Sequence, residues 1–140
     1  MSFYTLPSGK YFIGDISYIF NNRSWDEIVA VNNFNSAPFE VNASLVWAAH
    51  TANGDGEYED QNGNKYPVDS GVLGAVPIDL VENPEHESLG AVMNAPHGLE
   101  VSVEDGVFRF NEIVIDTDPD THFGSLDGGY DLDPNDDVIF

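Results

Sequence analysis

The sequence contains no cysteine, only four cationic side chains and no long apolar run. Without cysteine, the chain can build neither a disulfide framework nor a cysteine-ligated metal centre. The longest apolar stretch, residues 45–49, is far shorter than the roughly 18 residues that a membrane-spanning helix needs. The first residues show no basic segment followed by an apolar one. The sequence therefore predicts a cytoplasmic protein that does not enter membranes.

The scarcity of lysine and arginine also excludes a nucleic-acid-binding protein, because contacts to phosphates need clusters of cations. Against the four cations stand 25 carboxylates, which gives a net charge of −21. Ordinary small domains carry a net charge of about 2–8 in magnitude. Three explanations are open: solubility alone, adaptation to high salt, and a strongly basic partner whose surface normally binds nucleic acid.

The negative charge is concentrated in the second half of the chain. Residues 1–70 hold nine acids and three cations, whereas residues 71–140 hold sixteen acids and Arg109 alone. The last 25 residues contain eight Asp and neither Lys nor Arg. Adaptation to salt spreads acids over the whole surface, so this asymmetry favours an interaction face or an acidic tail.

Apolar and aromatic patterning predicts one ordered domain built mostly of strands. Nine Phe, six Tyr and two Trp can form a core. Ser24 and Glu27 have the spacing of a capping box, which predicts a short helix over residues 25–32. Asn62-Gly63 predicts a hairpin turn. Strands are expected over residues 10–20, 39–49, 57–60, 65–68, 72–81, 89–93, 99–103 and 107–116.

These elements predict a mostly β fold, or α+β with one short helix, arranged as an antiparallel sandwich or partly open barrel. A single compact domain is expected over residues 1–116, followed by an acidic C-terminal extension over residues 117–140. Gly14, Gly71 and Gly74 are expected to bend or bulge their strands. The expected core residues are Trp25, Ile28, Val29, Val46, Trp47, Ile78, Leu80, Val101, Phe110 and Ile115.

Four short runs begin at Gly9, Gly54, Tyr66 and Ile113. They resemble an uncharacterised family of small bacterial and phage proteins, and the resemblance covers roughly residues 9–117. It implies a shared fold but no activity. A bacterial or phage origin favours a host-directed inhibitor, which would act in the host cytoplasm if a phage encodes it.

The acidic second half carries Asp residues at alternate positions. Asp116, Asp118 and Asp120 are two residues apart, and Asp131 and Asp133 repeat the spacing. In an extended chain such side chains lie on one face, so they present charges in a row, as phosphates do along nucleic acid. A solvated strand face or loop is the alternative. The predicted partner-binding residues are Asp116, Asp118, Asp120, Asp127, Asp131, Asp133, Asp136 and Asp137.

The same run matches the first ligands of a calcium loop, with Asp127 at the twelfth position. However, Thr121 stands where such a loop has glycine, and Pro119 lies inside it. Binding of Ca²⁺ or Mg²⁺ at Asp116, Asp118, Asp120 and Asp127 is kept as an alternative, and no other cofactor is predicted. The four histidines do not have the spacing of a zinc site.

The sequence contains neither a Gly-x-Ser-x-Gly nucleophile turn nor a Gly-rich phosphate loop. We therefore expect a non-enzymatic acidic protein that occupies a basic, nucleic-acid-binding surface of a partner protein, as a DNA- or RNA-mimic inhibitor. A carboxylate-rich Ca²⁺-binding module, a salt-adapted β domain of unrelated role and a small β enzyme are the alternatives.

Overall fold

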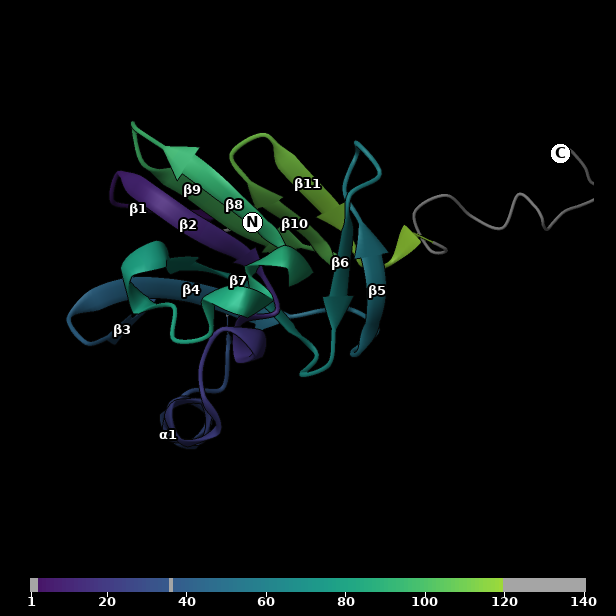
Figure 1. The fold of residues 1–140 in the computed structure, drawn as a ribbon. Helices are drawn as coiled ribbons and strands as arrows, with labels where there is room; N and C mark the ends of the chain where they lie inside the picture. Colours follow the sequence, from purple (N-terminus) through teal and green to yellow (C-terminus); the bar gives the residue numbers. More distant parts are fainter. Residues whose placement is uncertain (1–2, 36, 120–140) are drawn as a thin grey trace, which may run out of the picture.

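A computed structural model of the chain describes residues 3–35 and 37–119. Two antiparallel β-sheets pack face to face, and a helical layer covers the outer face of one of them (Figure 1). The predicted mostly β class is confirmed, and the sheets form a sandwich. Within the described residues there is one α-helix, as predicted.

The four-stranded sheet has the order β1-β9-β10-β11. Its members are β1 (Phe3–Leu6), β9 (Leu99–Glu104), β10 (Val107–Phe110) and β11 (Ile113–Asp116). The five-stranded sheet has the order β3-β4-β7-β2-β8. Its members are β3 (Phe39–Val41), β4 (Ser44–His50), β7 (Val72–Pro77), β2 (Gly9–Gly14) and β8 (Ala91–Ala95).

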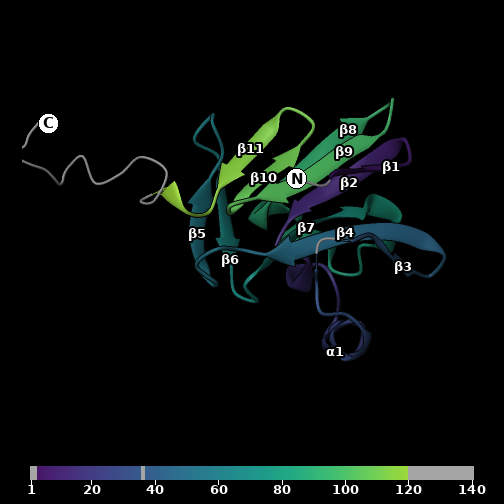
Figure 2. The ribbon, with the colours of Figure 1, turned by 180° about the vertical axis from the view of Figure 1, so that it is seen from behind.

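A separate hairpin of β5 (Gly56–Glu59) and β6 (Lys65–Val68) stands at one end of the sandwich. It lies beside β11 in the front view, and the view from behind shows the same neighbours (Figure 2). The helices are η1 (Ile16–Tyr18), α1 (Asn22–Val31), η2 (Ile78–Leu80) and η3 (Pro84–Leu89), of which all but α1 are short 3₁₀ helices.

The five-stranded sheet is buried on both faces because its central strands carry apolar side chains at successive positions. On β4, Trp47 and Ala49 point to the core between the sheets, whereas Val46 and Ala48 point to the helical layer. Successive side chains of a strand alternate between faces, so an uninterrupted apolar run fills two cores at once. Residues 46–49 of β4 are thus buried, whereas Ala43 is exposed and Ser44 and Leu45 are half-buried.

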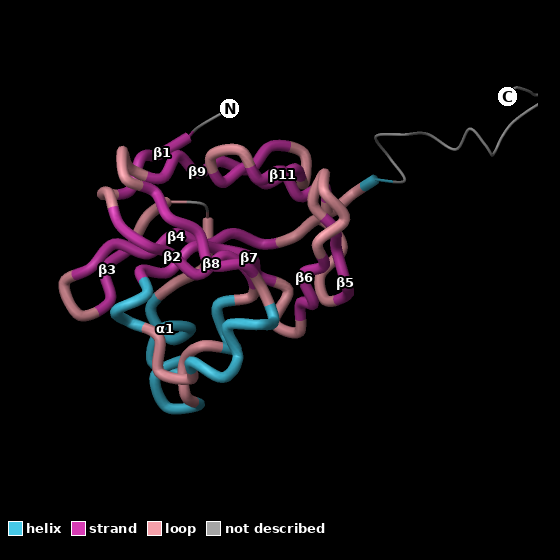
Figure 3. Tube along the Cα trace, turned by 45° about the horizontal axis from the view of Figure 1, so that its top comes forward, coloured by secondary structure: helices cyan, strands magenta, loops and turns pink. Residues whose placement is uncertain are grey.

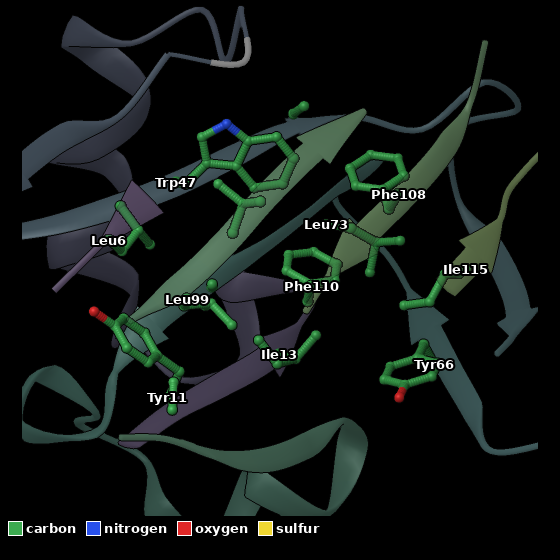
Figure 4. Close-up of a cluster of buried hydrophobic side chains, with 14 of the residues drawn as sticks. Leu6, Tyr11, Ile13, Trp47, Tyr66, Leu73, Leu99, Phe108, Phe110 and Ile115 are labelled. Atoms are coloured by element: carbon green, nitrogen blue, oxygen red, sulfur yellow. The ribbon is translucent and has the colours of Figure 1, made fainter. Parts of the chain in front are cut away.

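The core between the sheets is centred on three aromatic rings. Trp47 of β4 meets the rings of Phe108 and Phe110 of β10 edge to face, at centroid distances of 5.9 and 5.6 Å. Figure 4 shows these rings between strands of the two sheets. Tyr66 of the hairpin is part of the same core, so the hairpin is anchored to the sandwich by burial of its inner face.

The helical layer lies against the five-stranded sheet, on the side away from β1, β9 and β11 (Figure 3). Ile28 of α1 is buried, and the ring of Trp25 stacks on Phe34 at 5.6 Å. The predicted capping box is wrong. The N-cap is Asn21, whose side chain accepts a hydrogen bond of 2.9 Å from the Ser24 N–H, while the Ser24 hydroxyl donates to Glu82. The helix therefore begins earlier than predicted, at Asn22.

Several predicted strands are shorter than the apolar runs that suggested them. The run over residues 39–49 folds back as a hairpin, because Asn42 and Ala43 take positive φ angles of 50° and 67°. The run over residues 107–116 turns in the same way at Asn111, with φ of 53°. Two of the other runs continue as 3₁₀ helices, after Gly14 and after Pro77.

Gly74 is not a bulge. It pairs in regular register with Gly14 of β2 and Ala48 of β4, in the middle of the sheet. A Cβ atom there would collide with the Trp47 carbonyl oxygen and would lie 2.7 Å from the Ala48 Cβ. Glycine is required at this position by the close approach of the neighbouring strand.

Most of the expected core is confirmed. Val46, Trp47, Val101, Phe110 and Ile115 have almost no exposed surface, and Ile28 is buried. Trp25, Ile78 and Leu80 are partly buried and pack against the core of the helical layer. The expectation is wrong for Val29, which is 45% exposed because it lies on the outer face of α1.

Candidate functional site

The β5–β6 hairpin is joined to the free edge of β11. An antiparallel bridge pairs Asp60 with Ile115. The side-chain amide of Gln61 accepts a hydrogen bond of 2.9 Å from the Val114 N–H and donates one to the carbonyl oxygen of Glu112. These contacts satisfy main-chain groups that an edge strand otherwise leaves open. The hairpin, although a separate sheet, thereby covers part of the edge of β11.

Asp60 is the residue that fixes the hairpin turn. Its carboxylate accepts hydrogen bonds from the backbone N–H of Asn62 and from the backbone and side chain of Asn64, at 2.8–3.1 Å. The hydroxyl of Tyr66 donates another, of 2.9 Å. Burial acts to raise the pKa of Asp60, but the hydrogen bonds outweigh it and hold this pKa below its usual range. Asp60 is thus a structural carboxylate.

The register of the strands sets two carboxylates on either side of a valine on the outer face of the four-stranded sheet. Asp116 of β11 lies opposite Val107 of β10, and Val107 lies opposite Glu104 of β9. In the hairpin, Glu59 lies opposite Lys65. Glu59 directly precedes Asp60, and Asp116 directly follows Ile115, so the Asp60–Ile115 bridge brings these two parts of the chain together.

A hollow of about 670 Å³ lies where the hairpin meets the outer face of β10 and β11. We call it the hairpin groove. It is lined by Glu57, Tyr58, Glu59, Asp60, Gln61, Val107, Arg109, Val114, Asp116 and Pro119. Val107, Val114 and Pro119 supply apolar surface, while four carboxylates and one guanidinium supply charge. The groove is thus apolar in part and negative on balance.

The carboxylates of β5 already hold one cation of the chain. The Lys65 ammonium lies 3.6 Å from Oε1 of Glu57 and 3.9 Å from Oε2 of Glu59. All three side chains are more than half exposed, so this pairing adds little stability. Arg109 is also exposed, and among the described residues no carboxylate lies close enough to form an ion pair with it.

The predicted ladder of Asp residues is not extended where the structure describes it. Asp116 ends β11, and its Oδ1 accepts a hydrogen bond of 2.8 Å from the Asp118 N–H, which turns the chain. Asp116 and Asp118 are both half-buried. Of these two, Asp116 lines the hairpin groove. The other predicted binding residues lie outside the described residues: Asp120, Asp127, Asp131, Asp133, Asp136 and Asp137.

Thr117 anchors the chain just before it reaches the end of the described part. Its hydroxyl donates a hydrogen bond of 2.7 Å to the Gly106 carbonyl oxygen and accepts one from the Ala52 N–H. Asn53 donates a bond of 2.7 Å to the Thr117 carbonyl oxygen. The packed structure therefore continues one residue past β11, and Pro119 then lines the hairpin groove.

The structure does not test the predicted calcium loop, because two of its four candidate ligands, Asp120 and Asp127, lie outside the described residues. Across residues 3–35 and 37–119, no group of three or more His, Asp or Glu side chains is arranged to hold a metal ion. His50, one of the four histidines, contacts the Asn33 carbonyl oxygen at 3.0 Å and packs edge to face on Phe34.

No family model matches the chain, and no curated protein or solved structure matches it either. The resemblance to small bacterial and phage proteins stays a prediction. In the part of the chain that the structure describes, no helix has the length and apolar character needed to cross a membrane.

Four residues of the groove had no signal in the sequence. Tyr58, Gln61, Arg109 and Val114 are scattered over three segments, and only the pairing of the hairpin with β11 brings them together. Glu57 and Glu59 line the groove together with Asp116, and this placement depends on the Asp60–Ile115 bridge, which no local pattern predicts.

Proposed function

We propose that this protein binds a basic, nucleic-acid-binding surface of a partner protein and acts there as an inhibitor by presenting carboxylates where phosphates would lie. The observation that carries the proposal is the convergence of charge at the hairpin groove. Glu57, Glu59 and Asp116 lie together there. The chain continues from Pro119, at the same groove, into a segment with six further Asp and no Lys or Arg.

This distribution supports a protein partner of positive charge. Clefts lined by charge of one sign attract ligands of opposite charge and raise their association rate. A net charge of −21 repels nucleic acids and anionic substrates. A surface rich in Lys and Arg, such as one that binds nucleic acid, is the complementary partner.

Exposed carboxylates also lie away from the groove, for example Asp26 on α1, Glu40 on β3, and Asp79 and Glu85 in the 3₁₀ helices. Negative charge is therefore spread over the described surface as well as concentrated at the hairpin groove. One feature favours binding over adaptation to salt: the density of acids rises towards the C-terminal end.

The proposal places the protein in the cytoplasm of a bacterium, the host cell if a phage encodes it. There it would block a nucleic-acid-binding protein by competition. If the two compete for one site, the partner cannot bind nucleic acid and this protein at the same time.

The test is capture of the partner followed by displacement. The tagged protein is incubated with a lysate of the source cell at low salt, and the column is then washed with duplex DNA or with RNA at constant salt. We expect a basic protein that leaves the column with nucleic acid and that binds the same nucleic acid by itself. Retention of every captured protein in the presence of excess nucleic acid would contradict the proposal.

Two variants with equal charge change sharpen the test. One carries Glu57→Gln, Glu59→Gln, Asp116→Asn and Asp118→Asn at the groove end. The control carries Asp26→Asn, Glu40→Gln, Asp79→Asn and Glu85→Gln elsewhere. Each loses four negative charges, so a general effect of net charge weakens both equally. We expect the first variant to lose several times more affinity for the captured partner than the control does.

A further inference from the structure

We infer that two copies of this chain associate through β8, which pairs antiparallel with β8 of the second copy around Met93. The surface concerned is β8 together with its neighbour β2, and we call it the acid-free edge. It lies outside the hairpin groove and the acidic C-terminal segment, so the inference goes beyond the proposed function and does not depend on it.

The first argument is the distribution of charge. Residues 1–14 and 89–98 contain no Asp or Glu, although the chain has 25 acids. The fold brings these two distant segments together, because β2 and β8 pair antiparallel, with Lys10 opposite Asn94. Figures 1 and 2 show β1, β2 and β8 side by side. A chain with a net charge of −21 therefore has a sheet edge that carries a cation and no carboxylate.

The second argument is that β8 is open to pairing. It is the last strand of the five-stranded sheet, and no described strand pairs with its outer side. Among the described residues, its only backbone bond apart from the pairing with β2 is the turn bond from the Gly98 N–H to the Ala95 carbonyl oxygen. Edge strands are commonly protected from pairing by Lys, Pro or a bulge. The residues of β8, Ala-Val-Met-Asn-Ala, include neither Lys nor Pro, and all five pair in regular register with β2.

The third argument is apolar surface on both faces of this strand. Val92 is 46% exposed. Ala91 and Met93, which point to the opposite face, pack against the core between the sheets but are only half-buried. A further strand beside β8 would remove this apolar surface from water, which favours association.

The other strands at the ends of the two large sheets are less suited to pairing. The edge of β11 is covered by Gln61 and by the Asp60–Ile115 bridge. Strand β3 carries Glu40. Strand β1 pairs with β9, where Glu100 lies opposite Thr5. Strand β8 is the end strand that a negatively charged molecule can approach without meeting a carboxylate on the strand itself or on its neighbour.

The same charge distribution identifies the occupant as a second copy of the chain. Two copies repel each other over most of their surface, because each carries a charge of −21. A two-fold interface brings the same patch of both copies together, so the acid-free edges meet while the acidic surfaces stay in solvent. A basic partner is attracted to carboxylates and has no electrostatic reason to bind here. The register centred on Met93 pairs all five residues of β8, with Val92 of one copy opposite Asn94 of the other.

Cross-linking tests this register directly, because the chain contains no cysteine. In the inferred dimer the two Met93 lie opposite each other, with Cα atoms about 4.5–5.5 Å apart, which is within the range of a disulfide. Met93→Cys treated with oxidised glutathione is expected to form a disulfide-linked dimer at least about tenfold faster than two control variants. The controls are Phe3→Cys on β1 and Val31→Cys on α1, whose native side chains are 62% and 80% exposed. Exposure alone would favour the controls.

Sedimentation velocity of the cysteine-free protein measures the association without a cross-link. We expect the dimer fraction to rise between about 0.15 and 1 M salt, because salt screens the repulsion between the copies. Val92→Glu places two carboxylates diagonally across the interface, about 7–8 Å apart, and is expected to raise the dimer Kd by about tenfold or more. Val31→Glu makes the same exchange at an exposed valine of α1 and is expected to leave the Kd unchanged.

Three results would overturn the inference. They are a wild-type protein that stays monomeric at about 1 mM in both salt concentrations, a dimer that Val92→Glu and Val31→Glu affect equally, and faster cross-linking of Phe3→Cys than of Met93→Cys. None of them bears on the displacement of the captured partner by nucleic acid, so the proposed function is decided separately. Thermal unfolding shows whether each variant keeps its fold, and sedimentation of the wild-type protein and Val92→Glu decides the matter if Met93→Cys does not.

Discussion

The hydroxyl of Tyr66 donates a hydrogen bond of 2.9 Å to Oδ2 of Asp60, and both residues are buried. This bond connects the inner face of the β5–β6 hairpin to its turn. Asp60 also forms the bridge to Ile115 of β11. Asp60 therefore shapes the turn through its carboxylate and joins the hairpin to β11 through its backbone.

Loss of this bond is expected to destabilise the protein and to alter its response to acid. Tyr66→Phe removes a buried hydrogen bond to a charged group, which costs about 1.5–3 kcal/mol. Because the pKa of Asp60 is held below its usual range, its contribution to stability is present at neutral pH and is lost as the pH falls through that lowered pKa. Urea unfolding at pH 7 and at about pH 3 is expected to show a smaller acid-induced loss in the variant. An equal loss in both proteins would contradict this role of Asp60.

Gln61 is expected to protect the edge of β11. Gln61→Ala removes both bonds to the strand and leaves the Val114 N–H open to water, at a cost of about 1 kcal/mol. Hydrogen exchange at the Val114 amide should become faster, and the open edge should promote self-association. The control is Gln61→Glu, which keeps an oxygen that can accept the Val114 bond. An unchanged hydrogen-exchange rate at the Val114 amide in the alanine variant would show that the Gln61 side chain does not protect this edge.

Asp15 connects the helical layer to the hairpin, and its substitution is expected to destabilise the protein strongly. It is fully buried, and each carboxylate oxygen accepts two hydrogen bonds. The donors are the N–H groups of Ser17, Asp69 and Ser70 and the Ser70 hydroxyl. Asp15→Asn turns an amide group towards two of these donors, which costs roughly 2–5 kcal/mol. Ser70→Ala, which removes one donor, should cost less. Chemical unfolding measures the loss of stability in both variants. An equal loss in the two, or a larger loss in Ser70→Ala, would contradict this expectation.

Gly74 and Gly63 form a matched pair for backbone substitution. Gly74→Ala places a methyl group against the Trp47 carbonyl oxygen in the middle of the sheet, and overpacking of this kind costs about 3 kcal/mol or more. Gly63 has a φ of 82° in the hairpin turn, with no atom within 4 Å of the added methyl, so its exchange for alanine costs about 1 kcal/mol. Thermal unfolding compares the two, and a tolerated Gly74→Ala would show that the neighbouring strand can move.

Local patterns in the sequence predicted the structure correctly where one short segment determines its own conformation. Asn62-Gly63 predicted the β5–β6 hairpin, because glycine favours the positive φ of such a turn. The apolar residues within 39–49 predicted a strand, and residues 46–49 of it are buried on both faces of the sheet. The turn at Asn42 and Ala43 was missed, because alanine at positive φ is uncommon and gives no signal.

The groove could not be predicted because it depends on contacts between distant segments. Asn21 rather than Ser24 caps α1, and Ser24 instead bonds to Glu82, which is 58 residues away. Likewise, Glu59 and Asp116 line the same groove because the Asp60–Ile115 bridge joins the hairpin to β11. The sequence indicated a negative C-terminal half, but the apolar surface beside the charges and the position of Arg109 required the fold.

The most direct test of the proposed function is the affinity for the captured basic partner as salt is raised from about 50 to 500 mM. Wild type is compared with Asp118→Asn, with Asp133→Asn and with a variant in which Asp116, Asp118, Asp120, Asp131 and Asp133 are all exchanged for Asn. In a binding surface made of many carboxylates, a single one contributes below about 1 kcal/mol, so the single variants should bind almost as wild type does. The combined variant should bind far more weakly, with a shallower dependence on salt. Loss of all binding from one exchange, together with an affinity that salt does not change, would contradict the account.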